Sequence, residues 1–287
     1  MKTGFIGLGQ MGRGMAARLV DKGFDVVAWN RSAAPAEALR EHGARIASAP
    51  AQTLDADVIV TMLADDAAVE AVWLESGLVS KMPAGAVHLN MSSVSLRLAT
   101  KLRDAHAAGA YVAAPVFGRP ASAASGELDI VAGGKREAIA RCGPLFDALG
   151  RRWFDVGDDP THANVVKIAR NFVLASIIES LGEAFALVEK SGVEPARFHD
   201  IITSTAMSCP SYRNYGRLII DKPAEATFTV KLGLKDVELA LQVAGDTGVP
   251  LPLGELMREQ HLGAIARGYG EREWASVGNY IAEKAGL

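Results

Sequence analysis

The chain has 287 residues, a length typical of two domains, and 49% of them are hydrophobic, which is enough to bury a large core. Its formal net charge is −3 and its lysines and arginines are scattered, so the sequence predicts no nucleic-acid partner. The two cysteines, Cys142 and Cys209, lie far apart without metal-ligand spacing, so we expect no metal site, no disulfide framework and a reduced, cytoplasmic setting.

The sequence shows no sign of export or of membrane insertion. We find no apolar run that approaches the length of a membrane span, and we therefore expect no membrane partner. Residues 2–7 already form a strand-like segment, without the basic and apolar regions of a signal peptide.

The first 29 residues predict a strand at 2–7, a helix from 11 to about 22 and a second strand at 24–29. The turn between the first strand and the helix has the pattern G-x-G-x-x-G, formed by Gly7, Leu8, Gly9, Gln10, Met11 and Gly12. In this context the glycines allow a tight turn, a close approach of the backbone to a pyrophosphate, and close packing of helix on strand. The helix N-terminus then faces negative charge. The pattern therefore predicts a dinucleotide site, with a plain glycine-rich turn as the alternative.

The end of the second strand indicates which dinucleotide binds. Asn30, Arg31 and Ser32 follow it, where an NAD-specific site usually has an acidic residue for the ribose 2′-hydroxyl. A neutral residue followed by a guanidinium suits a 2′-phosphate, so we expect NADP in preference to NAD. The alternative is that Arg31 is an ordinary solvated arginine.

Helices and strands continue to alternate up to residue 156. We expect strands at 44–47, 57–63, 86–90, 111–116, 127–132 and 153–156, and helices at 34–42, 65–73, 95–108 and 136–149. Segment 57–63 is apolar throughout, as in strands that are buried on both faces.

Two loops of this region are candidates for ligand contact, because ligands bind at the carboxyl ends of such strands. In these loops we expect Met62, Leu63 and Ser93 to contact the cofactor and Ser92 to contact the substrate. Both serines could equally cap a helix.

The turn-forming cluster at 157–160 predicts a domain boundary. After it the strand signal nearly vanishes, and we expect helices at 161–190, 195–204, 212–220, 231–247, 253–267 and 273–282. The predicted fold class is therefore α/β with a mostly parallel sheet over 1–159, followed by an all-α domain over 160–287.

Segment 161–190 contains no proline and has apolar residues at helical spacing, so it predicts one long, largely buried helix. Asn164, Lys167 and Asn171 share one face of that helix. Polar side chains on an apolar helix are costly unless they face something polar. We therefore expect this stripe to face an active site.

Five segments of the sequence carry a family resemblance: GFIGLGQMG, NRS, APVFGRPASAASGEL, KIARN and LGLKDVELAL. In this order they resemble the β-hydroxyacid dehydrogenases. That family includes 3-hydroxyisobutyrate dehydrogenase, tartronate semialdehyde reductase and short-chain semialdehyde reductases, and is related to 6-phosphogluconate dehydrogenase and the imine reductases. The resemblance covers essentially the whole chain. It implies an N-terminal Rossmann domain, a helical C-terminal domain, an active site in the cleft between them, and a homodimer or homotetramer.

The resemblance also implies roles for individual residues. Lys167 stands at the position of the catalytic lysine and Asn171 at that of its supporting asparagine, and both would also contact the substrate. Segment 114–126 would contact the substrate through Phe117, Gly118 and Arg119. Lys235 and Asp236 match a pair that closes over cofactor and substrate respectively, and Ser93 stands near the nicotinamide.

The expected chemistry agrees with the residue types. A hydride that reaches a carbonyl carbon leaves charge on the oxygen, which then needs a proton donor within hydrogen-bond reach. An ammonium on a rigid helix can supply that proton, so we expect Lys167 to act as general acid/base and Asn171 to orient the substrate oxygen. The alternative is that Lys167 extends along the helix towards solvent.

The sequence departs from the family pattern at the substrate loop. Family members that act on small hydroxyacids usually have D-A-P-V-S-G-G, whereas this chain has Phe117 for the serine and Arg119 for the second glycine. Arg119 could bind an anionic substrate in a different way, or point to solvent. Otherwise the substrate is bulkier, more apolar or uncharged.

The predicted activity is reduction of a small aldehyde or keto acid by NADPH, reversible as oxidation of a 3-hydroxyacid. One alternative is an imine reductase, although such relatives usually replace the lysine that this chain keeps at Lys167. The other is a non-catalytic NADP-binding module. Such relatives tend to lose the lysine and to carry additional reader domains.

Overall fold

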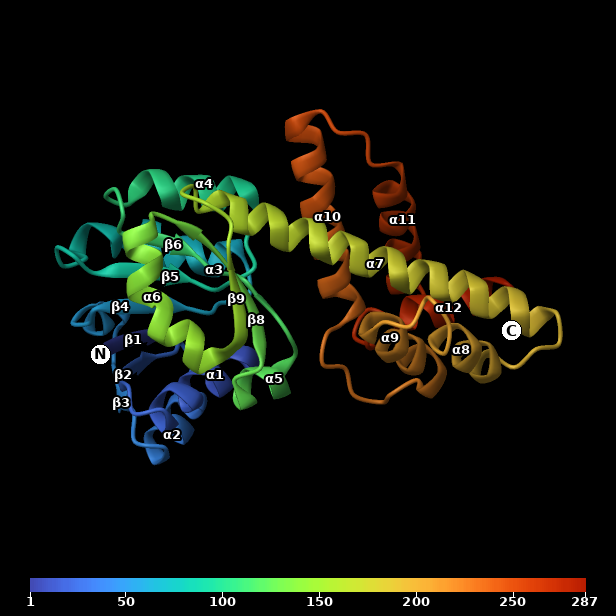
Figure 1. The fold of residues 1–287 in the computed structure, drawn as a ribbon, viewed down its shortest axis with the longest axis horizontal. Helices are drawn as coiled ribbons and strands as arrows, with labels where there is room; N and C mark the ends of the chain where they lie inside the picture. The colour runs from blue at the N-terminus through green and yellow to red at the C-terminus, as the bar shows by residue number, and fades with distance from the viewer. The chain divides into compact units, whose positions relative to one another are not determined.

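A computed structural model describes residues 1–287 and divides them into two compact units, Met1–Lys167 and Ile168–Leu287 (Figure 1). Helix α7 (Thr161–Lys190) has the bounds expected from its apolar periodicity, and it contributes residues to both units. The boundary predicted from the turn cluster, between residues 159 and 160, lies one residue before the start of this helix.

The first unit is built on one mostly parallel sheet, as predicted. Parallel strands follow the order β3-β2-β1-β4-β5-β6. Strand β8 pairs antiparallel with β6 and β7, and β9 pairs parallel with β8. The strands are β1 (Lys2–Ile6), β2 (Asp25–Trp29), β3 (Arg45–Ile46), β4 (Val58–Thr61), β5 (Val87–Asn90), β6 (Tyr111–Ala113), β7 (Val116–Phe117), β8 (Leu128–Gly134) and β9 (Gly150–Asp155). This is the order of a Rossmann sheet: the chain builds β1, β2 and β3 outward in one direction and then continues with β4 on the other side of β1. In such sheets the ligand crevice lies at this reversal, between β1 and β4.

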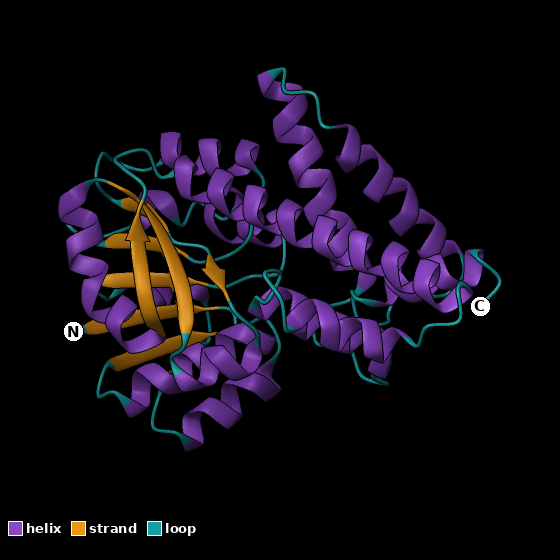
Figure 2. Ribbon diagram, turned by 45° about the vertical axis from the view of Figure 1, so that its right-hand side comes forward, coloured by secondary structure: helices purple, strands orange, loops and turns teal.

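Helices cover both faces of this sheet (Figure 2). They are α1 (Gln10–Asp21), α2 (Ala33–Glu41), α3 (Asp66–Glu70), α4 (Leu96–Ala105), α5 (Pro120–Ser125) and α6 (Arg136–Leu149). Val58 and Val60 belong to the apolar cluster on one face and Ile59 to the cluster on the other. This alternation confirms that strand β4 is buried on both faces.

The sequence prediction missed or misplaced some elements of the first unit. The single strand expected at 111–116 is divided into β6 and β7 by Pro115, which has no N–H to donate to a sheet. Helix α5 was not predicted, because it is only six residues long. The helix expected at 95–108 ends at Ala105.

The second unit consists of the rest of α7 and five further helices joined by loops (Figure 2). These are α8 (Pro195–Thr203), α9 (Pro210–Asp221), α10 (Val230–Thr247), α11 (Pro252–Ala266) and α12 (Ser276–Lys284), which confirms the all-helical prediction. Proline stands in the first turn of α8, α9 and α11, where its missing N–H costs nothing. The core is formed by side chains such as Leu174, Val237, Met257 and Trp274.

Helix α7 corrects the expectation about membrane spans. By length and composition alone it could cross a membrane, since an 18-residue window within it has a mean hydropathy of 1.5. However, 50% of that window is buried within the structure. Its buried Glu179 also accepts a hydrogen bond from Gln260 Nε2 at 2.8 Å. Burial and an internal polar partner are typical of the core helix of a folded unit.

Candidate functional site

The glycine-rich turn lies at the carboxyl end of β1 and leads into α1. Gly7 has φ of 100°, and a Cβ added there would overlap the carbonyl oxygen of Met62. A Cβ at Gly12 would overlap the carbonyl oxygen of Gly7. These two positions therefore exclude side chains because of the protein's own backbone.

Gly9 differs from the other two glycines of the motif. A Cβ added at Gly9 would meet no atom within 4 Å, so the fold itself leaves open space there. Gly9 is the N-cap of α1 and no side chain caps this helix end. The first-turn N–H groups of α1 therefore have no side-chain partner, and a negatively charged group could accept from them. Open space and free donors fit a pyrophosphate.

Asn30 fixes the turn from the neighbouring strand. Its Oδ1 accepts a hydrogen bond from the Leu8 backbone N–H at 2.9 Å, and its Nδ2 donates to the backbone oxygen and the hydroxyl of Ser32, both at 2.9 Å. Asn30 therefore joins the turn predicted to hold the pyrophosphate to the segment predicted to hold the 2′-phosphate. Arg31 is exposed and takes part in no ion pair.

Ser92 joins the two predicted cofactor loops. Its hydroxyl is buried, accepts a hydrogen bond from the Leu63 N–H at 2.8 Å and lies 3.4 Å from the Thr61 carbonyl oxygen. Neither Ser92 nor Ser93 caps the following helix, because Ser95 is the N-cap of α4 and accepts from Leu98 N–H. The helix-cap alternative is thus wrong for both serines. Ser93 is half-buried beside this junction.

Lys167 lies against the substrate loop within the first unit. Its Nζ donates a hydrogen bond to the Val116 carbonyl oxygen at 2.8 Å and stands 4.9 Å from the centre of the Phe117 ring. Gly118, with φ of 148°, follows, and Arg119 is the N-cap of α5. The structure therefore brings Lys167 together with the loop that was predicted to contact the substrate.

In the second unit, Asn171 pairs with Asp236. Asn171 Nδ2 donates to Asp236 Oδ2 at 2.7 Å, and both side chains are buried. Asn171 Oδ1 accepts from Arg170 at 3.3 Å. Asp236 therefore fixes the orientation of the Asn171 amide, a role that the sequence did not indicate. Lys235, the neighbour of Asp236 on α10, is half-buried.

Asn164 also lies on α7, one turn before Lys167. It is 1% exposed and its Oδ1 has no hydrogen-bond partner. The shared helix face with Lys167 was visible in the sequence, but the missing partner was not.

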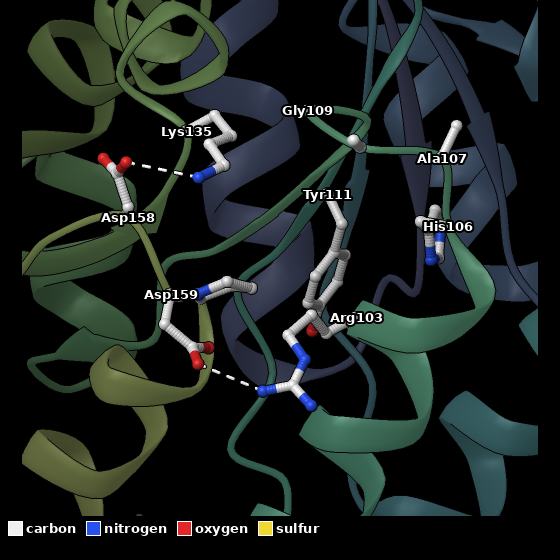
Figure 3. A pocket seen from close by; sticks show the side chains of 10 residues that line it. Arg103, His106, Ala107, Gly109, Tyr111, Lys135, Asp158 and Asp159 are labelled. Carbon is white, nitrogen blue, oxygen red and sulfur yellow. Dashed lines mark hydrogen bonds and ion pairs between the residues drawn. The ribbon is translucent and has the colours of Figure 1, made fainter.

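A cavity of about 490 Å³ lies at the end of the sheet away from the glycine-rich turn (Figure 3). Tyr111, the first residue of β6, and the loop after α4 line it, so it lies near the amino ends of the parallel strands. Two ion pairs border it, Arg103–Asp159 at 3.0 Å and Lys135–Asp158 at 3.2 Å. None of the predicted site residues lines this cavity.

A hydrogen-bonded pair of histidines is buried beside this cavity. His106 Nδ1 lies 2.6 Å from the Leu102 carbonyl oxygen, which can only accept, so this nitrogen carries the hydrogen. His106 Nε2 then accepts from His88 Nδ1 at 3.1 Å, and His88 Nε2 accepts from the Thr61 hydroxyl at 3.0 Å. The Trp73 indole N–H donates to the same hydroxyl at 2.8 Å and its ring stacks on His88. With both imidazoles neutral, each of the four ring nitrogens has a hydrogen-bond partner.

This arrangement predicts loss of stability in mild acid. Burial holds the pKa of His88 well below its ordinary value of 6.5 and the neighbouring His106 lowers it further, while burial also lowers the pKa of His106 and of His261. The unfolded chain therefore binds more protons, so the stability is fully present above about pH 6.5 and falls below it. Only Glu179, whose pKa burial raises from 4.5, opposes this trend. Urea unfolding should give a smaller free energy at pH 5.5 than at pH 7.5 (about one unit either side of the ordinary histidine pKa), and equal values would contradict the account.

Two protein-family models match the chain. Residues 2–157 match the model of the NAD-binding domain of 6-phosphogluconate dehydrogenase, and residues 161–281 match that of the NAD-binding region of NADP-dependent 3-hydroxyisobutyrate dehydrogenase. The chain is 38% identical to an uncharacterized oxidoreductase, YfjR, of Bacillus subtilis, over 96% of this chain and 98% of the relative. It is 30% identical to glyoxylate/succinic semialdehyde reductase 1 of Arabidopsis thaliana, over 96% and 97% of the two chains.

A solved structure gives the same fold. The 3-hydroxyisobutyrate dehydrogenase of Mycobacterium tuberculosis, solved with L-serine, superposes with a TM-score of 0.87 over 98% of both chains, at 23% identity.

Proposed function

Because the chain belongs to the β-hydroxyacid dehydrogenase family, we propose that it transfers a hydride between NADP(H) and a small aldehyde or keto acid, or the matching 3-hydroxyacid. At the coarser level it is an oxidoreductase with a pyridine-nucleotide-binding domain. The observation that carries the finer proposal is the Lys167 ammonium, which donates to a carbonyl oxygen, that of Val116, beside the substrate loop.

The proposed mechanism assigns the proton to Lys167. Bound NADPH would supply the hydride. As the carbonyl carbon accepts it, the electron pair of the C=O bond moves to the oxygen, and the ammonium donates a proton to that oxygen. The amine regains a proton from solvent. Val116 O and the Phe117 ring hold the ammonium in place between turnovers.

We assign Asn171 the orientation of the substrate oxygen. The buried Asp236 carboxylate accepts from its Nδ2, which fixes the amide on α7 one turn after Lys167. Lys235, Ser93, Met62 and Leu63 remain proposed cofactor contacts, and Ser92, Phe117, Gly118, Arg119 and Asp236 proposed substrate contacts. In the substrate loop, Phe117 offers no hydrogen-bond donor, which leaves Arg119 as the cationic group there that could hold an anionic substrate.

The preference for NADP rests on Arg31. An exposed guanidinium without an ion-pair partner beside Asn30 is available to a 2′-phosphate. Exchanging Arg31 for alanine should raise KM for NADPH by roughly tenfold or more, as expected for a charge-assisted hydrogen bond, and leave KM for NADH nearly unchanged. Steady-state kinetics with both cofactors checks this, and an equal effect on both would remove the assignment.

A panel of substrates separates the proposal from its alternatives. NADPH oxidation is measured with glyoxylate, succinic semialdehyde, methylglyoxal and a cyclic imine. Turnover of a carbonyl compound supports the proposal, whereas turnover of the imine alone supports an imine reductase. Tight NADPH binding without any turnover would favour a non-catalytic module. We further propose a homodimer or homotetramer, which exposed apolar side chains of α7 such as Val173 and Leu187 favour. We also propose a cytoplasmic location, because the only two cysteines lie far apart in the sequence.

A further inference from the structure

The unpartnered oxygen of Asn164 points to a contact that the protein alone does not make. A buried amide oxygen without a donor loses its hydration and gains nothing in return. Such atoms are few in native structures, and each calls for an explanation. The side chain of Asn164 is 1% exposed, and its Oδ1 is one of four buried polar side-chain atoms of the chain without a partner.

The position of Asn164 connects it with the proposed active site. It precedes Lys167 by three residues on α7, so the two side chains leave the same face of the helix. The adjacent Ala163 belongs to the same apolar cluster as Val94, which directly follows the loop Ser92–Ser93. The start of α7 and the loop that holds Ser93, a proposed cofactor contact, therefore border the same apolar cluster.

The two reactants differ in whether they offer a hydrogen-bond donor to Asn164 Oδ1. An aldehyde or keto acid that is to be reduced has only acceptor oxygens at its reacting end, and Lys167 serves these. The nicotinamide ring carries a carboxamide, whose NH₂ group supplies two donors, on the carbon next to the one that releases hydride. An acceptor one turn from the proton donor thus matches the carboxamide and not the substrate carbonyl.

On this basis we propose that Asn164 Oδ1 accepts a hydrogen bond from the carboxamide of the nicotinamide. The inference rests on the proposed function. The contact fixes the rotation of the ring about its glycosidic bond, and so determines which face of the ring is turned towards the carbonyl and Lys167. Asn164 is therefore a positioning residue for hydride transfer.

A cofactor analogue tests this contact without turnover. In the 3-acetylpyridine analogue of NADP⁺ a methyl group replaces the carboxamide NH₂. Equilibrium binding to the full-length wild-type protein should be roughly three- to tenfold tighter for NADP⁺ than for the analogue, as expected for one hydrogen bond. Asn164→Leu should bind both with equal affinity. Asn164→Asp, which keeps an acceptor oxygen, should retain the preference.

Thr3 provides a matched control. Its Oγ1 is also buried without a partner, but it lies on β1, four residues before the glycine turn. Thr3→Val should keep the wild-type preference for NADP⁺. Because each exchange removes an unsatisfied polar atom, neither Asn164→Leu nor Thr3→Val should lower the melting temperature of the free protein.

The outcomes distinguish failure of this inference from failure of the proposed function. If the wild-type protein binds neither dinucleotide, the proposed function and the inference fall together. If it binds NADP⁺ but Asn164→Leu keeps the preference over the analogue, the inference alone is overturned. Loss of the preference in a folded Asn164→Asp, or in Thr3→Val, would also overturn it.

Discussion

Replacing Lys167 with alanine should lower kcat by about 10²–10⁴-fold, the range that a positioned general acid contributes. Affinity for NADPH should change little, because the ammonium contacts Val116 and Phe117 of the substrate loop and not the glycine turn. The measurement pairs steady-state kinetics on the best carbonyl substrate with equilibrium binding of NADPH. The loss should appear in kcat and kcat/KM together, since the interaction is made in the transition state.

A second lysine of the same unit provides the control. Lys135 pairs with Asp158 beside the cavity near the amino ends of the parallel strands, away from Lys167. Lys135→Ala should therefore retain nearly full activity. If Lys167→Ala keeps most of its turnover, or if both alanine variants lose it equally, Lys167 is not the proton donor.

The glycines of the turn should respond differently to the same substitution. Gly9→Ala places its methyl in open space at a residue with φ of −67°, so its stability should stay within about 0.5 kcal/mol of wild type. The same methyl occupies the place where the backbone would approach the pyrophosphate, so affinity for NADPH should fall roughly tenfold or more.

Gly12→Ala should instead lower the stability of the folded protein. Its methyl would overlap the carbonyl oxygen of Gly7, a backbone atom that cannot move without opening the turn. We expect a destabilisation of about 1–3 kcal/mol, as for other overpacked sites. Urea unfolding and NADPH titration of the two variants check this pair. If Gly9→Ala binds NADPH as tightly as wild type, the pyrophosphate does not lie at this turn.

Much of the fold could be predicted from local patterns. The apolar spacing of 161–190 gave the bounds of α7, and the alternation of strands and helices gave the Rossmann unit. The strand order could not be derived in this way, because pairing depends on contacts between distant segments. Elements that consist of a few residues, such as α5 and the separate strands β6 and β7, give too short a pattern to be recognised.

The site was predictable only as far as residue types and spacing allow. The glycine turn and Lys167 were named from the sequence, and the structure gives the contacts of both. The roles of Asn30 and Ser92 as links between loops could not be foreseen, since their partners, Leu8 and Leu63, are more than twenty residues away. The same holds for the orphaned oxygen of Asn164, because a missing partner is visible only when all neighbours are in place.

The central claim is that a hydride passes from the nicotinamide to a carbonyl carbon while Lys167 provides the proton. Turnover of the best carbonyl substrate with NADPH deuterated at the hydride-donating position tests it most directly. We predict that mass spectrometry of the product alcohol finds deuterium on the former carbonyl carbon, and that Lys167→Ala forms this product at least about a hundredfold more slowly. Oxidation of the cofactor without deuterium in the product, or formation of the labelled alcohol at the wild-type rate by the variant, would contradict the account.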